Sequence, residues 1–158
     1  MIYIGDRWAD YRREGKIFIV TDKILTLGVD ATNDLLIRVP DNSGIIALMQ
    51  AEIADYADFY IYENPTLTNV GTALTPRNMN RAYSDGIDVL FFTNPQVNSV
   101  GTKIYDEFSL AWLGHFNEGT SVWEFKKGTD YLLRTHNLSE DPTYLKWRIV
   151  FRKITTDR

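Results

Sequence analysis

The final strand-forming segment, residues 145–152, places the strongest constraint on the fold. Every second side chain in it is apolar: Leu145, Trp147, Ile149 and Phe151. The side chains between them are charged at Lys146, Arg148 and Arg152, and only Val150 breaks the alternation. Successive side chains of a strand point to opposite faces of a sheet, so this period predicts an antiparallel strand with one buried and one solvated face.

Turn-forming residues divide most of the chain into short segments. Strands are predicted at residues 16–20, 23–29, 35–39, 45–54, 57–63, 87–92 and 102–113, followed by three more within 123–151. Turn signals recur about every 8–12 residues, which is typical of a sandwich or jelly roll. We therefore predict an all-β fold, an antiparallel β-sandwich or jelly roll with an extended N-terminal arm. No internal repeat is apparent.

Residues 45–64 are compatible with two local structures. Leu48, Met49, Ile53 and Tyr56 would form an acceptable apolar stripe on a helix. Alternatively, residues 45–54 form one strand and residues 57–63 form its hairpin partner. The second interpretation is favoured because Phe59-Tyr-Ile-Tyr62 has strong strand propensity.

The first 15 residues differ in character from the rest. They are rich in charged and aromatic residues, and we read no strand or helix period in them. We predict an arm at residues 1–15 and a single domain at residues 16–158, a length sufficient for one core. Aromatic side chains beside arginine are typical of interface anchors, so Trp8, Tyr11, Arg12 and Arg13 are the predicted partner-binding residues. The alternative is that this arm folds back over its own domain.

Several classes of function are disfavoured by composition. The net charge is −4, whereas a nucleic-acid-binding protein needs a basic face. There is no cysteine, and the only histidines are His115 and His136, so we predict no catalytic residues, no metal site and no cofactor. No segment has the length of a signal peptide core or a membrane span, so we expect no membrane association and synthesis in a cytoplasm.

Charge is unevenly distributed along the chain. Basic residues gather in residues 1–23 and in the last strand, whereas residues 30–88 are rich in Asp and Glu. These charges can simply be solvated surface, or they can form patches of opposite sign that meet on a partner or on another copy of the chain.

Two segments carry a resemblance to a known family. The first is Phe59-Tyr-Ile-Tyr-Glu-Asn-Pro-Thr66, followed by Gly71-Thr-Ala-Leu-Thr-Pro-Arg-Asn-Met-Asn-Arg81. The second is Phe125-Lys-Lys-Gly-Thr-Asp-Tyr-Leu-Leu-Arg-Thr-His-Asn-Leu-Ser139. Both resemble the decoration, or cement, proteins on the heads of tailed bacteriophages. The chain departs from that pattern at Lys127-Gly128, where the family usually has Pro-Asn, and at His136. The first 40 residues carry no resemblance.

The resemblance implies a jelly-roll-like domain without enzyme activity. It also implies that the protein lies on the exterior of a virion capsid and binds the major capsid protein. The resemblance further implies a homo-oligomer, and we expect a trimer. Asn78, Asn80 and Arg81 match the family stretch, and we expect the asparagine amides to close a long loop by bonding to the backbone. The alternative function is a phage adsorption module, a fibre or spike domain that binds host polysaccharide through a groove lined by Tyr or Trp.

Overall fold

The protein is almost entirely β-structure, as predicted. The computed structural model describes residues 4–109, 115–116 and 122–154. One helix, α1 (Ile4–Arg13), precedes the strands. These are β1 (Phe18–Leu27), β2 (Thr32–Arg38), β3 (Ile45–Ile53), β4 (Ala57–Glu63), β5 (Thr66–Asn69), β6 (Thr72–Leu74), β7 (Arg77–Asn78), β8 (Leu90–Thr93), β9 (Gln96–Ser99), β10 (Thr102–Ser109), β11 (His115–Phe116), β12 (Trp123–Phe125), β13 (Asp130–Asn137) and β14 (Thr143–Lys153).

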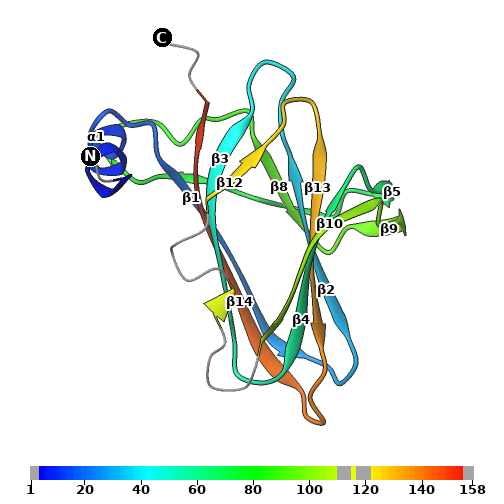
Figure 1. Ribbon diagram of the computed structural model, residues 1–158. Helices are drawn as coiled ribbons and strands as arrows, with labels where there is room; N and C mark the ends of the chain where they lie inside the picture. The colour runs from blue at the N-terminus through cyan, green and yellow to red at the C-terminus, as the bar shows by residue number, and fades with distance from the viewer. Residues whose placement is uncertain (1–3, 110–114, 117–121, 155–158) are drawn as a thin grey trace.

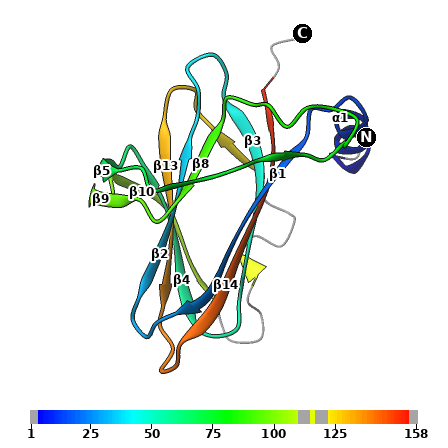
Figure 2. The same cartoon turned by 180° about the vertical axis from the view of Figure 1, so that it is seen from behind.

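Two antiparallel sheets form the sandwich seen in Figure 1. Sheet A has the order β11-β3-β14-β1-β7, with β12 also paired to β3. Sheet B has the order β10-β4-β13-β2-β8-β6. A third, two-stranded sheet, β5-β9, projects from the side of the sandwich, away from α1 (Figure 2). The β-sandwich predicted from the turn spacing is confirmed.

The pairing of the main strands is nested. β1 pairs with β14, β2 with β13, β3 with β12 and β4 with β10, all antiparallel. The first half of the chain therefore pairs with the second half in reverse order, as in one long hairpin. Because members of successive pairs lie in different sheets, this hairpin is wrapped around the core.

The facing predicted for the last strand is confirmed. Leu145, Trp147, Ile149 and Phe151 are each at most 1 % exposed. Trp147 meets Phe59 of the opposite sheet edge to face, with ring centroids 6.1 Å apart. These aromatic contacts between the sheets hold the centre of the core.

The segment at residues 45–63 forms two strands, so the helical alternative is wrong. The hairpin pairing is wrong as well, because β3 lies in sheet A and β4 in sheet B. The chain crosses between the sheets at residues 54–56, and the buried side chains of both strands face the same core. A period of 2 fixes which face of a strand is buried, but it does not choose the strand's neighbour.

The break predicted at Thr21-Asp22 does not occur. β1 is continuous there, with Thr21 opposite Arg148 and Asp22 opposite Trp147. The Thr93 hydroxyl donates a hydrogen bond to Asp22 Oδ2 at 2.6 Å, which satisfies this carboxylate within the sandwich.

The extended conformation predicted for residues 1–15 is wrong, because residues 4–13 form a helix. Trp8 and Tyr11 are three residues apart, which is the spacing of neighbours on a helix surface. In both views of the ribbon, α1 lies beside sheet A, next to the start of β1 (Figures 1 and 2).

The structure also reveals a repeat that the sequence analysis did not find. Residues 63–72 read Glu-Asn-Pro-Thr-Leu-Thr-Asn-Val-Gly-Thr, and residues 93–102 read Thr-Asn-Pro-Gln-Val-Asn-Ser-Val-Gly-Thr. In each copy a strand of sheet B, β4 or β8, leads through Asn-Pro into β5 or β9, and Val-Gly-Thr then leads into β6 or β10. Asn64 and Asn94 share a positive φ, 58° and 53°.

The two copies pack reciprocally. β5 pairs with β9, Thr72 of the first copy lies opposite Thr93 of the second, and Thr102 lies opposite Glu63. A Cβ atom on Gly71 would lie 2.2 Å from the Thr93 carbonyl oxygen, and one on Gly101 would lie 2.3 Å from that of Glu63. Glycine is required at both positions by this approach and by a positive φ.

The burial of β14 gives a direct test. Trp147→Ala should lower the free energy of unfolding by about 3–5 kcal/mol, because it leaves a cavity where both sheets meet. Lys146→Ala, on the outer face of the same strand, should change it by no more than about 0.5 kcal/mol. Chemical denaturation measures both, and equal losses would contradict this facing.

Candidate protein-binding surface around the N-terminal helix

Helix α1 ends at a glycine that reverses the chain. Gly15 has φ +71°, its N–H donates to the Arg12 carbonyl, and the Lys16 N–H donates to the Tyr11 carbonyl at 2.9 Å. These two bonds are those of a Schellman motif, which satisfies carbonyls at a helix C-terminus. Arg12 and Arg13 lie in the last turn, where a positive charge is favourable to the helix dipole.

A loop distant in sequence completes this cap. The Asn80 side-chain amide donates to the Arg13 carbonyl at 2.9 Å, and the Asn78 amide donates to the Gly15 carbonyl at 2.8 Å. The Met79 N–H donates to the Ile17 carbonyl. The expectation that the amides of Asn78 and Asn80 bond to the backbone is confirmed, and the backbone that they bind includes the end of α1.

Asp85 organises this loop. It accepts hydrogen bonds from Arg81 at 2.6 Å, from the Asn78 backbone N–H at 2.8 Å and from Arg77 at 3.0 Å. Arg81, the Asn78 N–H and Arg77, in that order of importance, hold the pKa of Asp85 well below its usual range. The carboxylate is therefore charged at neutral pH, and it keeps Asn78 in place for its contact with Gly15.

The side of α1 that carries Tyr11 is attached to the sandwich. The guanidinium of Arg152, from β14, lies 4.3 Å from the centroid of the Tyr11 ring. Such a cation–π contact favours a fixed position of the helix relative to sheet A.

A groove lies between α1 and the outer face of sheet A. Its volume is about 330 Å³. It is lined by Trp8, Ala9, Arg12, Ile17, Leu48, Met79 and Val150. We call it the α1 groove. Its lining is apolar except for Arg12, an exposed side chain, so the groove suits an apolar group that carries or adjoins a negative charge.

The outer face of sheet A extends this surface with positive charge. Register places Lys146, Arg148 and Arg152 of β14 on the outer face, together with Lys23 of β1. Of the outward side chains on β1, β3 and β14, only Glu52 is acidic. We call this surface the basic face. The whole chain is acidic, so the basic face is a local concentration of charge.

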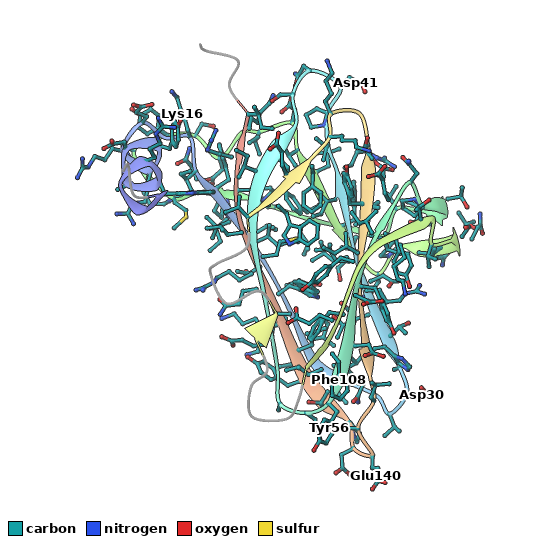
Figure 3. The ribbon with its side chains drawn as sticks, viewed as in Figure 1. Lys16, Asp30, Asp41, Tyr56, Phe108 and Glu140 are labelled. Atoms are coloured by element: carbon teal, nitrogen blue, oxygen red, sulfur yellow. The ribbon has the colours of Figure 1, made fainter. Side chains whose placement is uncertain are left out.

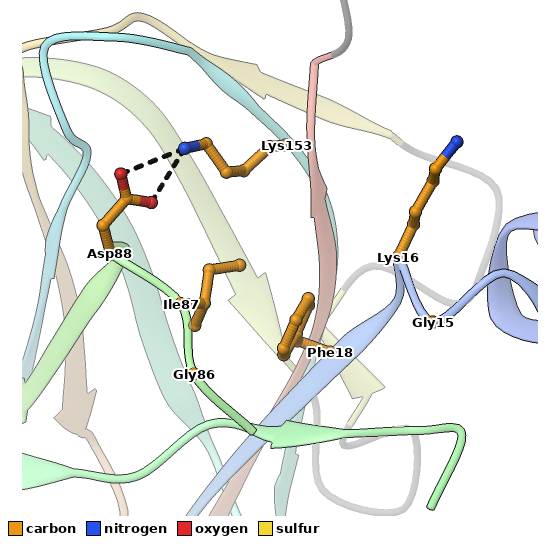
Figure 4. A pocket seen from close by; sticks show the side chains of 7 residues that line it. All are labelled: Gly15, Lys16, Phe18, Gly86, Ile87, Asp88 and Lys153. Carbon is orange, nitrogen blue, oxygen red and sulfur yellow. Dashed lines mark hydrogen bonds and ion pairs between the residues drawn. The ribbon is translucent and has the colours of Figure 1, made fainter. Parts of the chain in front are cut away.

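A second hollow, of about 440 Å³, adjoins Gly15 and Lys16 (Figure 4). Phe18 and Ile87 line it, and Lys153 bonds to Asp88 at 2.8 Å and to Asn42 at 2.9 Å. Lys153 lowers the pKa of Asp88. The Lys16 ammonium lies 2.7 Å from a Glu14 carboxylate oxygen. Since both lysines are paired within the chain, the α1 groove is the better candidate for binding.

The four predicted interface residues occupy different environments. Trp8 and Arg12 lie together in the α1 groove. Tyr11 faces Arg152, and Arg13 is exposed and pairs with Asp10 at 3.2 Å. The sequence analysis missed the groove residues supplied by the sheet and the loop, such as Leu48 and Met79. One signal in the sequence could have indicated these residues. Val150 breaks the alternation of β14 because it lies on the part of the outer face that lines the α1 groove.

His136 and several carboxylates of the described residues are engaged in pairs. His136 Nε2 lies 2.6 Å from Asp30 Oδ1, and Arg134 makes two bonds to Asp34 at 2.7 and 2.8 Å. His115 forms part of β11. From its glycine-flanked sequence we expect a turn at residues 114–119, most of which lies outside the described residues. Over residues 4–109, 115–116 and 122–154, no three His, Cys, Asp or Glu side chains form a metal-binding group. In the same residues, no helix has the length and apolarity to cross a membrane.

Comparison with known proteins adds no assignment. No protein-family model matches the chain, and no curated protein matches it significantly in sequence.

The Asp85 contacts predict a pH-dependent cap on α1. The pKa of Asp85 is lower in the folded state than in the unfolded state, where it is about 4. Asp85 therefore stabilises the fold at pH values above about 4, and this stabilisation is lost as the pH falls toward the folded-state pKa. Asp85→Asn removes both ion pairs, so the backbone amides of Lys16 and Asn78 should exchange hydrogen faster than in the wild type at pH 7. This difference should shrink as the pH falls below about 4.

Hydrogen exchange, corrected for its intrinsic pH dependence, measures the effect. Asp10→Asn is the matched control, because it removes an exposed carboxylate that pairs, among the described residues, with Arg13. Equal exchange rates in wild type and Asp85→Asn at pH 7 would show that Asp85 does not hold the cap.

Proposed function

We propose that this chain is a non-enzymatic structural protein of a tailed bacteriophage, which binds the outside of the assembled capsid and stabilises it. The observation that carries the proposal is the α1 groove, an apolar hollow with Arg12 in its lining, beside the basic face of a rigid sandwich. Such a surface fits a protein partner with apolar and acidic side chains.

The nested pairing supports a jelly roll, the finer form of the predicted fold. Eight strands in four pairs, wrapped as one long hairpin between two sheets, agree with that architecture. Jelly rolls occur in viral capsid and lectin domains, so the fold is compatible with a virion role.

The positions of the quoted family segments support the same function. The stretch that ends in Asn78-Met-Asn-Arg81 is the loop that caps α1 and supplies Met79 to the groove. The stretch from Phe125 to Ser139 forms β13, in the middle of sheet B. In this proposal, the family resemblance covers both the scaffold and one wall of the binding surface.

The physical advantage of such a protein follows from mass action. A ligand that binds only the assembled lattice stabilises that lattice, and many modest contacts act together. We propose the major capsid protein as its partner, a homo-oligomer of three copies as its active form, and the capsid exterior as its location. The proposal requires no cofactor and no metal.

One observation favours a second candidate, a phage adsorption module that binds host polysaccharide. Tyr60 and Tyr62, half-buried on the outer face of sheet B, have ring centroids 5.9 Å apart. Asp58 accepts a hydrogen bond from the Tyr60 hydroxyl at 2.9 Å. Burial, and next the Asp58 bond, raises the pKa of Tyr60 to about 12, so this phenol remains neutral. Paired tyrosines beside carboxylates suit the stacking and hydrogen bonding of a sugar.

Capsid binding is the test of the first candidate. Wild-type protein should co-sediment with assembled capsids of the phage that encodes it and raise their melting temperature. Arg12→Glu should weaken this binding about ten-fold or more, which is about 1.4 kcal/mol, because it places a negative charge in the groove. Lys127→Glu, the same charge change at an exposed turn position, is the control and should bind as the wild type does.

Two results would reject this assignment. The first is no binding to capsids at any stage of assembly. The second is binding to host polysaccharide that Tyr60→Ala abolishes, which would establish the adsorption module instead.

A further inference from the structure

One end of the sandwich presents aromatic side chains to solvent. Phe108 is 53 % exposed and Tyr56 is 44 % exposed, and their rings stack with centroids 6.1 Å apart and an interplanar angle of 9°. Figure 3 shows both residues at the end of the molecule that also carries Asp30 and Glu140. Large exposed apolar side chains that touch one another mark an interaction surface more strongly than isolated ones.

Three turns join the aromatic pair at this end. They are residues 28–31, 54–56 and 138–142, and with Phe108 we call them the tip. The Leu138 N–H donates to the Tyr56 carbonyl at 2.9 Å, so these two turns lie side by side. The Asn137 amide reaches the carbonyl oxygens of Leu27, Gly28 and Asp141 at 3.0–3.1 Å. Val29 and Leu138 are also exposed, which extends the apolar surface across the tip.

The tip is acidic as well as apolar. Its turns contain the carboxylates Asp30, Asp55, Glu140 and Asp141, and no Lys or Arg. Asp58 is the second residue after the middle turn. The tip is therefore an apolar projection whose turns carry negative charge, whereas the α1 groove is an apolar hollow beside positive charge.

We propose that the tip of one copy docks in the α1 groove of a second copy, with Tyr56 and Phe108 against the apolar lining and the tip carboxylates near Arg12 and the basic face. The shapes and the charges are complementary, which favours this partner. The contact requires two molecules, because the tip and the α1 region lie at opposite ends of one chain (Figure 3).

A contact between two different surfaces of identical chains has a definite consequence for assembly. Each docked copy leaves its own groove or tip free for the next copy, so the association is head to tail. It closes into a ring when the rotation between copies allows it, and it otherwise continues as a chain. The inference rests on the proposed role of the α1 groove as a protein-binding surface, and it names the partner in the homo-oligomer. A tip and the capsid protein cannot occupy one groove together, so the capsid protein binds the groove that is left free at the end of an open chain.

Two variants separate the two surfaces. The groove variant carries Arg12→Glu and Arg148→Glu, and the tip variant carries Phe108→Ser and Glu140→Lys. Sedimentation velocity without capsids should show concentration-dependent association of the wild type. Each variant alone should associate about ten-fold more weakly or not at all. Leu90→Ser, which removes an exposed apolar side chain of sheet B, is the control and should associate as the wild type does.

Mixing the two variants gives the decisive result. The groove variant keeps an intact tip and the tip variant keeps an intact groove, so an equimolar mixture should form 1:1 dimers that do not extend. Rising salt should weaken these dimers, since exposed charges are screened. Circular dichroism and thermal melting confirm that both variants are folded.

Three outcomes would overturn the proposal: a wild type that stays monomeric up to about 100 µM, a tip variant that assembles normally, or a mixture of folded variants that stays monomeric. Capsid co-sedimentation of the same proteins keeps the two hypotheses apart. A wild type that is monomeric but binds capsids would reject this inference and leave the proposed function standing.

Discussion

Strand β14 organises the molecule through both of its faces. It is hydrogen-bonded to β1 on one side and to β3 on the other. Its inner face supplies Trp147 and Phe151, which contact Phe59 and Phe91 of the opposite sheet. Its outer face supplies Val150 to the α1 groove and Arg152 to the Tyr11 ring. The same strand thus joins the two sheets and positions the helix, so the core and the candidate binding surface depend on one another.

The parts of the fold that follow from local pattern were predictable. The burial of Leu145, Trp147 and Ile149 follows from the period of 2, because a strand next to a core must bury one complete face. The pattern of residues 45–63 likewise predicts two strands. It does not contain their pairing, because the inner faces of β3 and β4 look equally apolar whether the strands are neighbours or face each other across the core.

Other features depended on contacts distant in sequence. A ten-residue helix has only marginal stability alone. Contacts with Arg152, Asn78 and Asn80 hold α1, and no pattern within residues 1–15 predicts these contacts. Part of the groove was predicted: Trp8 and Arg12 were expected in a partner surface. Leu48 and Met79 were not, because they come from other elements. The Asn-Pro and Val-Gly-Thr repeat was present in the sequence, and its reciprocal packing became evident only with both copies in place.

That reciprocal packing separates the scaffold from the surface that it carries. The two copies of the repeat hold β6, which ends at Leu74, against β8, which begins at Leu90. The segment between these two strands contributes Met79 to the α1 groove. Its length and composition are therefore free of the register of sheet B. Natural variation at Met79 would alter what the groove recognises, whereas Asn78, Asn80 and Asp85 must be kept because they hold the cap on α1. The duplicated segment thus allows the lining of the groove to change at Met79 without a change in the register of sheet B.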